Sequence, residues 1–158
     1  MSVRQARPGD AVELVRLRAM MLQGLERSVA WDDEWREPAR QTLVDRLADP
    51  ESTLTAFVVD KEGGGLAACA VGTIEQRLGG PSDPEGRVGY VFSVVTEPAE
   101  RRRGHSRACL TALLDWFRAR GVHRVDLRAS SEGEPLYESL GFRRTRDPAM
   151  RLRLPATD

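Results

Sequence analysis

The sequence predicts an α/β fold with a mixed, mostly antiparallel sheet and helices on both of its faces, in one domain spanning residues 1–158. Three observations lead to this prediction. Apolar runs of strand length alternate with amphipathic stretches of helix length. The strand-like runs between residues 54 and 96 follow one another through a glycine turn and a loop with no helix between them, which favours antiparallel pairing. The last of these runs is followed by a helix and another strand, and such a crossover makes the flanking strands parallel.

The first fifty residues predict one short strand and two helices. Ser2–Ala6 forms the strand, and Pro8-Gly9-Asp10 ends it and starts the first helix. In that helix Asp10 is the expected N-cap, with Glu13 completing a capping box. An irregular segment over residues 28–36 follows. The second helix places Ala39, Leu43, Val44 and Leu47 on one face, and Asp49-Pro50 ends it.

The rest of the chain predicts a hairpin, a long strand and two further helices. Glycines at 63–65 form the hairpin turn, and Gly121 and Gly141 end the two helices. In chain order the elements are strands Leu54–Asp60, Leu66–Gln76 and Arg87–Thr96, helix Ser106–Arg120, strand Val122–Ala129, helix Pro135–Leu140 and an extended return over Phe142–Leu154.

Composition excludes several classes of protein. Hydrophobic residues make up 41% of the chain and charged residues 30%, which is typical of a soluble globular protein and not of a disordered one. The formal net charge is zero, which argues against a nucleic-acid partner. No apolar run approaches the ~20 residues of a membrane span, and no signal-type segment is present, so we expect a cytoplasmic protein. Cys69 and Cys109 lie in apolar patterns and are expected to be buried and reduced.

The junction over Val95–Ser106 suits an anion. It joins an apolar strand to an amphipathic helix, and a helix N-terminus directs unpaired backbone N–H groups and a partial positive charge at one point. Phosphate or pyrophosphate is the natural ligand there. Arg101, Arg102 and Arg103 add charge, and Gly104 removes a Cβ that would hinder close approach of the backbone.

Two sequence motifs follow the long strand. Arg101–Ser106, preceded by Pro98, resembles the pattern Gln/Arg-x-x-Gly-x-Gly/Ala, and Pro135–Phe142 resembles the pattern Leu-Tyr-x-x-x-Gly-Phe. Both are patterns of the GCN5-related N-acetyltransferase (GNAT) superfamily, which the sequence therefore resembles. The element order extends the resemblance over nearly the whole chain. It departs at Ser106, where Gly or Ala is usual. Serine is small, so its N–H can still face phosphate and its hydroxyl can donate a further hydrogen bond.

The resemblance implies acetyl-CoA as donor co-substrate, no metal, and direct transfer of the acetyl group to a primary amine of a small molecule or protein. The pyrophosphate is expected at the helix start and the pantetheine arm along the preceding strand edge, where its amides pair like an added strand. A backbone N–H near Val95 is the expected oxyanion donor. The expected cofactor-binding residues are Val94, Val95, Thr96, Arg101, Arg102, Arg103, Gly104, His105 and Ser106.

Tyr137 matches the general-acid tyrosine of the family by position, and the alternative is that it only packs. The general base stays open among Glu97, Glu75, the carboxylates of the segment over residues 32–34, a water relay, or an amine that arrives deprotonated. Expected acceptor-binding residues are Trp31, Asp32, Trp35, Tyr90 and Ser93. Alternatively, the two tryptophans are core anchors and the acids a charge cluster at a helix start.

The sequence leaves two alternatives to an acetyltransferase. One is a catalytically silent CoA-binding sensor of the same fold. The other is a nucleotide phosphate-binding protein, which the missing Walker lysine and the absence of Gly-x-Gly-x-x-Gly make weaker. The resemblance also implies a homodimer. The sequence does not identify the acceptor amine, because one fold serves many substrates.

Overall fold

The computed structural model describes residues 2–25 and 31–156 and divides into two compact units, residues 1–128 and 129–158. Residues 28–30 of the irregular segment predicted between the first two helices lie outside the described residues.

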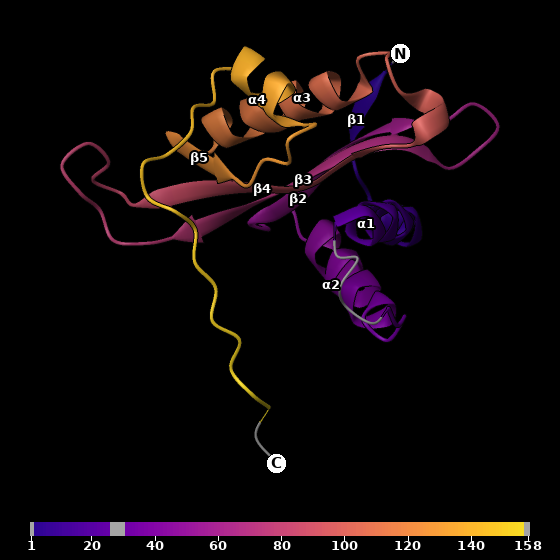
Figure 1. Cartoon of the computed structure of the whole chain (residues 1–158), viewed down its shortest axis with the longest axis horizontal. Coiled ribbons are helices and arrows are strands. Elements are labelled where there is room, and N and C mark those ends of the chain that lie inside the picture. Colours follow the sequence, from indigo (N-terminus) through magenta and orange to yellow (C-terminus); the bar gives the residue numbers. More distant parts are fainter. Residues whose placement is uncertain (1, 26–30, 157–158) are drawn as a thin grey trace. The chain divides into compact units, whose positions relative to one another are not determined.

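The first unit contains a five-stranded mixed sheet with its strands in chain order (Figure 1). Neighbours from β1 to β4 are antiparallel, and β4 and β5 are parallel, as the helical crossover between them requires. The predicted mixed sheet is therefore confirmed. The strands are β1 (Val3–Gln5), β2 (Leu54–Asp60), β3 (Leu66–Gln76), β4 (Arg87–Thr96) and β5 (Arg124–Leu127).

Helices cover both faces of this sheet. Helices α1 (Ala11–Leu25) and α2 (Arg36–Ala48) lie on one face and α3 (His105–Ala119) on the other (Figure 1). The buried cluster on the α1 and α2 side is closed by partly buried residues, Phe92 of β4 among them. Both cysteines are free and buried, as expected. The cluster consists of Ala6, Leu14, Leu17, Ala56, Val58, Leu66, Cys69, Val71 and Val95.

Helix α3 packs very closely on the sheet because two glycines face it. A Cβ added at Gly72 or at Gly89 would lie 2.8 Å from the ring of Phe117, closer than real Cβ contacts permit. Phe117 and Leu113 are fully buried in this contact. The absence of a side chain at Gly72 of β3 and at Gly89 of β4 thus sets the distance between α3 and the sheet, and with it the position of the β4–α3 junction.

The start of α1 differs from its prediction. Asp10 lies in the 3₁₀ turn η1 (Pro8–Asp10). Its carboxylate accepts the N–H of Arg7, the residue before this turn, at 2.8 Å, whereas the prediction made Asp10 the N-cap of α1. Glu13 does not close a capping box. It accepts the N–H of Leu66 on β3 at 2.8 Å and pairs with Arg16. The capping-box prediction is wrong because a neighbouring strand competes for the Glu13 carboxylate.

The second unit contains the short helix α4 (Glu134–Ser139). Tyr137 of this helix makes a T-shaped ring contact with Phe142, with 6.0 Å between the centroids. The extended return predicted over Phe142–Leu154 is not a strand, since none of the residues 142–156 is in a sheet. Met150, Leu152 and Leu154 alternate with arginines as in a strand but are exposed, and an alternating pattern alone supplies no partner for the backbone.

Candidate active site

The junction between β4 and α3 contains two residues with positive φ and leaves several of its backbone N–H groups without an acceptor in the described chain. A 3₁₀ turn, η2 (Pro98–Glu100), follows β4, and Gly104 precedes α3 in the left-handed conformation with φ +78°. Arg102 also has a positive φ of +67°. Among the described residues none accepts a hydrogen bond from the backbone N–H of Arg102, Arg103, Gly104 or Ser106. These donors and the dipole of α3 favour an anion at this point.

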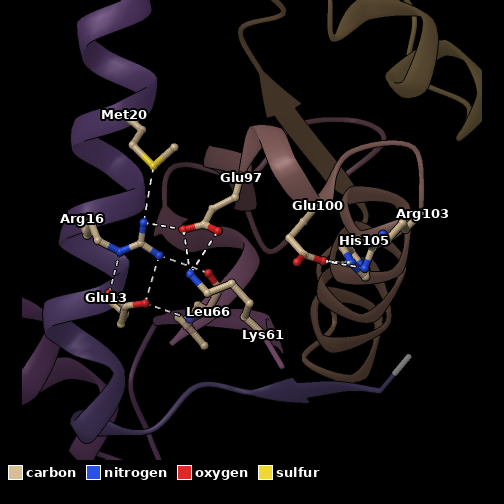
Figure 2. A network of polar contacts seen from close by, with 9 residues as sticks. All are labelled: Glu13, Arg16, Met20, Lys61, Leu66, Glu97, Glu100, Arg103 and His105. Atoms are coloured by element: carbon tan, nitrogen blue, oxygen red, sulfur yellow. Dashed lines mark hydrogen bonds and ion pairs between the residues drawn. The ribbon is translucent and has the colours of Figure 1, made fainter. Parts of the chain in front are cut away.

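The side chains of the junction divide into two sets. Glu100 holds Arg103 at 3.0 Å and lies 3.5 Å from the Nε2 atom of His105, which is buried (Figure 2). Arg101 and Arg102 are exposed. The Arg103 and His105 side chains therefore shape the turn, and the side chains of Arg101 and Arg102 remain at the surface to attract an anion.

A hydroxyl pair links the two elements of the junction. Thr96 Oγ1 at the end of β4 and Ser106 Oγ at the start of α3 are 2.6 Å apart. The Ser106 hydroxyl was expected to be able to donate a further hydrogen bond, and the structure gives it Thr96 as a partner. Serine at this motif position therefore links the strand end to the helix start, and its N–H is the group left for a ligand.

The end of β4 has an unpaired edge. On the β5 side, pairing stops at Val91 with Leu127, so within the described part of the first unit no strand pairs with Val94–Thr96 there. On the other side, the N–H of Glu97 donates to Ala67 O on β3 at 2.9 Å. Successive N–H groups of a strand point to opposite edges, so the Thr96 N–H points away from β3, toward the free edge.

A β-bulge lies at the start of this edge. The register passes from Val71 opposite Phe92 to Cys69 opposite Val95, so two residues of β4 face one of β3. Ser93 in the bulge is buried and has φ +50°, which is strained for a residue other than glycine. The Cys69 thiol donates to Ser93 O at 3.2 Å. Such bulges redirect a strand and often lie beside active sites.

Glu97 lies in a cluster of charges (Figure 2). Its carboxylate is 2.5 Å from Arg16 Nη1 and 3.1 Å from Lys61 Nζ, and it is only 9% exposed. Arg16 also pairs with Glu13 at 2.6 Å and donates to Leu66 O at 3.2 Å. The cluster therefore joins α1, the β2–β3 turn and the end of β4.

Protonation of Glu97 is unfavourable in this cluster. Burial opposes its ionisation, but hydrogen bonds from Lys61 and Arg16 outweigh burial and lower its pKa. A general base must accept a proton near neutral pH, and a carboxylate with two cationic partners is poorly suited to that task. Glu75, another candidate, is exposed and pairs with Arg77 at 3.0 Å.

The residues predicted to bind the acceptor lie in two places. Tyr90 stacks with Phe92 on β4 at 6.4 Å between centroids, and Ser93 follows them. Arg18 of α1 donates from Nη1 to Ser93 Oγ at 2.6 Å, and its guanidinium carbon lies 5.8 Å from the Phe92 centroid. No motif indicated Arg18, because its partner lies 75 residues away along the chain.

Trp31, Asp32 and Trp35 form a local structure before α2. The two indoles make an edge contact with 5.9 Å between centroids, and Trp31 is 39% exposed. Asp32 accepts the N–H of Glu34 at 2.9 Å. Arg36 lies over the Trp35 ring, 5.7 Å from its centroid. Trp31 is thus no core anchor, and Asp32 shapes the turn that starts α2.

Tyr137 lies in the second unit, where it is 9% exposed. Burial raises the pKa of its phenol, which therefore stays protonated at neutral pH. A Cβ added at Gly133 would lie 2.9 Å from its ring, so glycine leaves room for the tyrosine four residues later.

Comparisons with known proteins decide the family. The model of the acetyltransferase (GNAT) family matches residues 19–142, more than half of the chain. The chain belongs to this family. GNAT enzymes are N-acetyltransferases, and the match spans both motifs and strands β2 to β5 of the sheet.

Three relatives illustrate the likeness. A glucosamine 6-phosphate N-acetyltransferase of Trypanosoma brucei brucei is 38% identical over 56 residues, which are 35% of this chain and 38% of that protein. A predicted acetyltransferase from Clostridium acetobutylicum, solved with acetyl-CoA, has a TM-score of 0.82 at 24% identity, covering 96% of this chain and 95% of that one. A GCN5-related N-acetyltransferase from Ralstonia eutropha JMP134 has a TM-score of 0.80 at 25% identity, covering 96% and 97%.

Within residues 2–25 and 31–156, no group of three or more His, Cys, Asp or Glu side chains is arranged to hold a metal ion. None of the helices in the described part of the chain has the length and apolarity needed to cross a membrane.

Proposed function

We propose that this GNAT protein transfers the acetyl group of acetyl-CoA to the primary amine of a small molecule or a protein. One observation carries the proposal: an unpaired strand edge, Val94–Thr96, leads within a few residues to unpaired N–H groups at the start of α3. The first suits an amide-bearing arm and the second a pyrophosphate.

The residues present fit such a donor. The N–H groups of Arg102, Arg103, Gly104 and Ser106 are available to phosphate oxygens, and the left-handed Gly104 carries no Cβ to obstruct them. Arg101 and Arg102 supply attraction from the surface. Arg103 and His105 take part through the turn they hold with Glu100. Backbone therefore contributes more to this site than the arginine side chains do.

Acetyl-CoA, when bound, supplies an activated acetyl thioester. The chain then has to stabilise negative charge on the carbonyl oxygen as the amine attacks. The Thr96 N–H is the donor best suited to this task, because it points to the free edge of β4. This refines the expectation of a donor near Val95, and the Thr96–Ser106 hydroxyl pair keeps the strand end fixed.

Tyr137 is the proposed general acid for the leaving thiolate. Its raised pKa keeps the proton available at neutral pH. Glu97 receives a structural role in this proposal, since it is already paired with Arg16 and Lys61. The amine is then deprotonated by water or arrives as the free base.

A thiol-release screen tests the proposed function. The purified chain is mixed with acetyl-CoA and a library of amines, and free CoA thiol is measured. We expect turnover with at least one amine, and about a 10- to 1,000-fold lower kcat for Tyr137→Phe with unchanged affinity for CoA. Binding of CoA without thiol release for any amine would contradict the enzyme and favour the silent sensor. Equal kcat for the wild type and Tyr137→Phe would remove the tyrosine from the mechanism.

A further inference from the structure

Arg18 of α1 lies against the bulge of β4 without an acidic partner. It is half-buried, and among residues 2–25 and 31–156 no carboxylate forms an ion pair with it. Its contacts are the Ser93 hydroxyl at 2.6 Å and the Phe92 ring, 5.8 Å from the guanidinium carbon. Arg16, two residues earlier on the same helix, forms ion pairs with both Glu13 and Glu97.

This arrangement leaves the positive charge of Arg18 without a counter-charge and several of its N–H donors without an acceptor in the described chain. A half-buried guanidinium loses part of its hydration, and proteins ordinarily compensate with a carboxylate. Here a neutral hydroxyl takes one N–H and an aromatic ring faces the cation. The other N–H donors of the planar fork have no acceptor in the described chain, and that fork suits the bidentate binding of an oxyanion.

Arg18 is held close to the end of β4, where the proposed reaction takes place. Ser93 is three residues before Thr96 on the same strand, roughly 10 Å along it at the usual rise per residue. The hydrogen bond to Ser93 and the Phe92 ring fix the guanidinium on this strand. Tyr90 stacks with Phe92 and extends the aromatic surface beside the cation. A small acceptor can therefore contact Arg18 while its amine lies near the end of β4.

We infer that the acceptor amine carries an oxyanion, a carboxylate or a phosphate ester, and that Arg18 binds it. This inference rests on the proposed function and narrows its substrate class. The bound oxyanion completes the ion pair that the chain itself does not supply. Phe92 and Tyr90 pack against the body of the acceptor, and Ser93 holds the guanidinium in place.

Matched acceptors and variants test the inference. One pair is an amino acid with its carboxamide, and another is an aminoalkyl phosphate with the corresponding amino alcohol. Thiol release is measured for the wild type, Arg18→Gln, Arg18→Lys and the control Arg118→Gln, which removes an exposed arginine of α3 paired with Asp115. Calorimetric titration with CoA and thermal unfolding are run on every variant.

We expect the wild type to prefer the charged member of at least one pair, and the pair identifies carboxylate or phosphate as the group bound. Arg18→Gln should raise the KM for that acceptor about 10- to 100-fold, with the affinity for CoA unchanged. Arg18→Lys should recover part of the loss because it keeps the charge and loses the fork. Arg118→Gln should behave as the wild type.

Two results overturn the inference and are distinguishable from failure of the proposed function. Equal or better use of the neutral acceptors by the wild type excludes an oxyanion-bearing substrate. An equal loss of kcat/KM for both members of a pair in Arg18→Gln assigns Arg18 to holding the bulge alone. In both cases thiol is released, whereas failure of the proposed function gives no thiol release with any amine.

Discussion

Substitution of Glu97 by Gln separates a structural carboxylate from a catalytic one. The change keeps the shape of the side chain and removes the negative charge that faces Arg16 and Lys61. The two cations then face a neutral amide. The Glu97 side chain is 12% exposed, whereas the side chains of Arg16 and Lys61 are 34% and 31% exposed.

These exposed fractions limit the stability that Glu97→Gln is expected to lose. Breaking a fully buried ion pair costs about 3–5 kcal/mol, and an exposed pair contributes about 0–1 kcal/mol. The cations here reach solvent and Arg16 keeps Glu13, so the loss should lie between these limits, at about 2 kcal/mol. For a chain of this size that corresponds to a Tm lower by roughly 4–8 °C.

The contribution of Glu97 to stability should decrease as the pH is lowered. The folded chain lowers the pKa of Glu97 below its usual 4.5, so its contribution to stability is present above pH 4.5 and is lost as the pH falls through the folded pKa. The variant has no such carboxylate. The difference in Tm between wild type and Glu97→Gln should therefore be largest near neutral pH and shrink on acidification.

Thermal unfolding from pH 3 to 7 and thiol-release kinetics measure both quantities. Glu75→Gln is the matched control, because Glu75 is exposed and its surface pair with Arg77 contributes about 0–1 kcal/mol. We expect kcat of Glu97→Gln to stay within about threefold of the wild type, whereas loss of a general base would lower it about 10²- to 10⁴-fold. An unchanged Tm together with a kcat lower by at least about 100-fold would refute the structural role and restore Glu97 as the base.

Two further predictions concern glycines. Gly104→Val should weaken CoA binding at least about tenfold in calorimetric titration. The reason is that φ +78° is strained for a β-branched residue, so the N–H groups around position 104 would shift. Unchanged affinity would place the pyrophosphate elsewhere. Gly89→Ala should lower the free energy of unfolding by about 1–3 kcal/mol in urea titration, because the added Cβ lies 2.8 Å from the Phe117 ring; an unchanged midpoint would show that α3 shifts without cost.

The sheet was predictable because its signals are local. The bounds of β2, β3 and β4 are those expected from apolar runs delimited by glycine-rich and proline-rich turns. The sequence also places a glycine at the start of α3, and Gly104 has the left-handed conformation that glycine adopts without strain. Features of this kind depend on residues only a few positions apart.

The parts that sequence did not predict depend on distant partners. The Ser106 hydroxyl meets Thr96, and Glu97 meets Lys61 and Arg16 from two other elements. A carboxylate after a strand has the same local pattern whether it serves as a base or as an ion-pair partner. The alternation over residues 150–154 similarly predicted a strand, although pairing requires a partner edge that no local pattern specifies.

Hydrogen exchange of the backbone amides with and without CoA tests the central claim most directly, because the claim concerns backbone donors at the end of β4 and the start of α3. We predict that CoA slows exchange at Thr96, whose N–H points to the free edge of β4, and at Arg102, Arg103, Gly104 and Ser106, whose N–H groups lack acceptors in the described chain. Slower exchange confined to other segments, or no change in any amide at saturating CoA, would contradict the account.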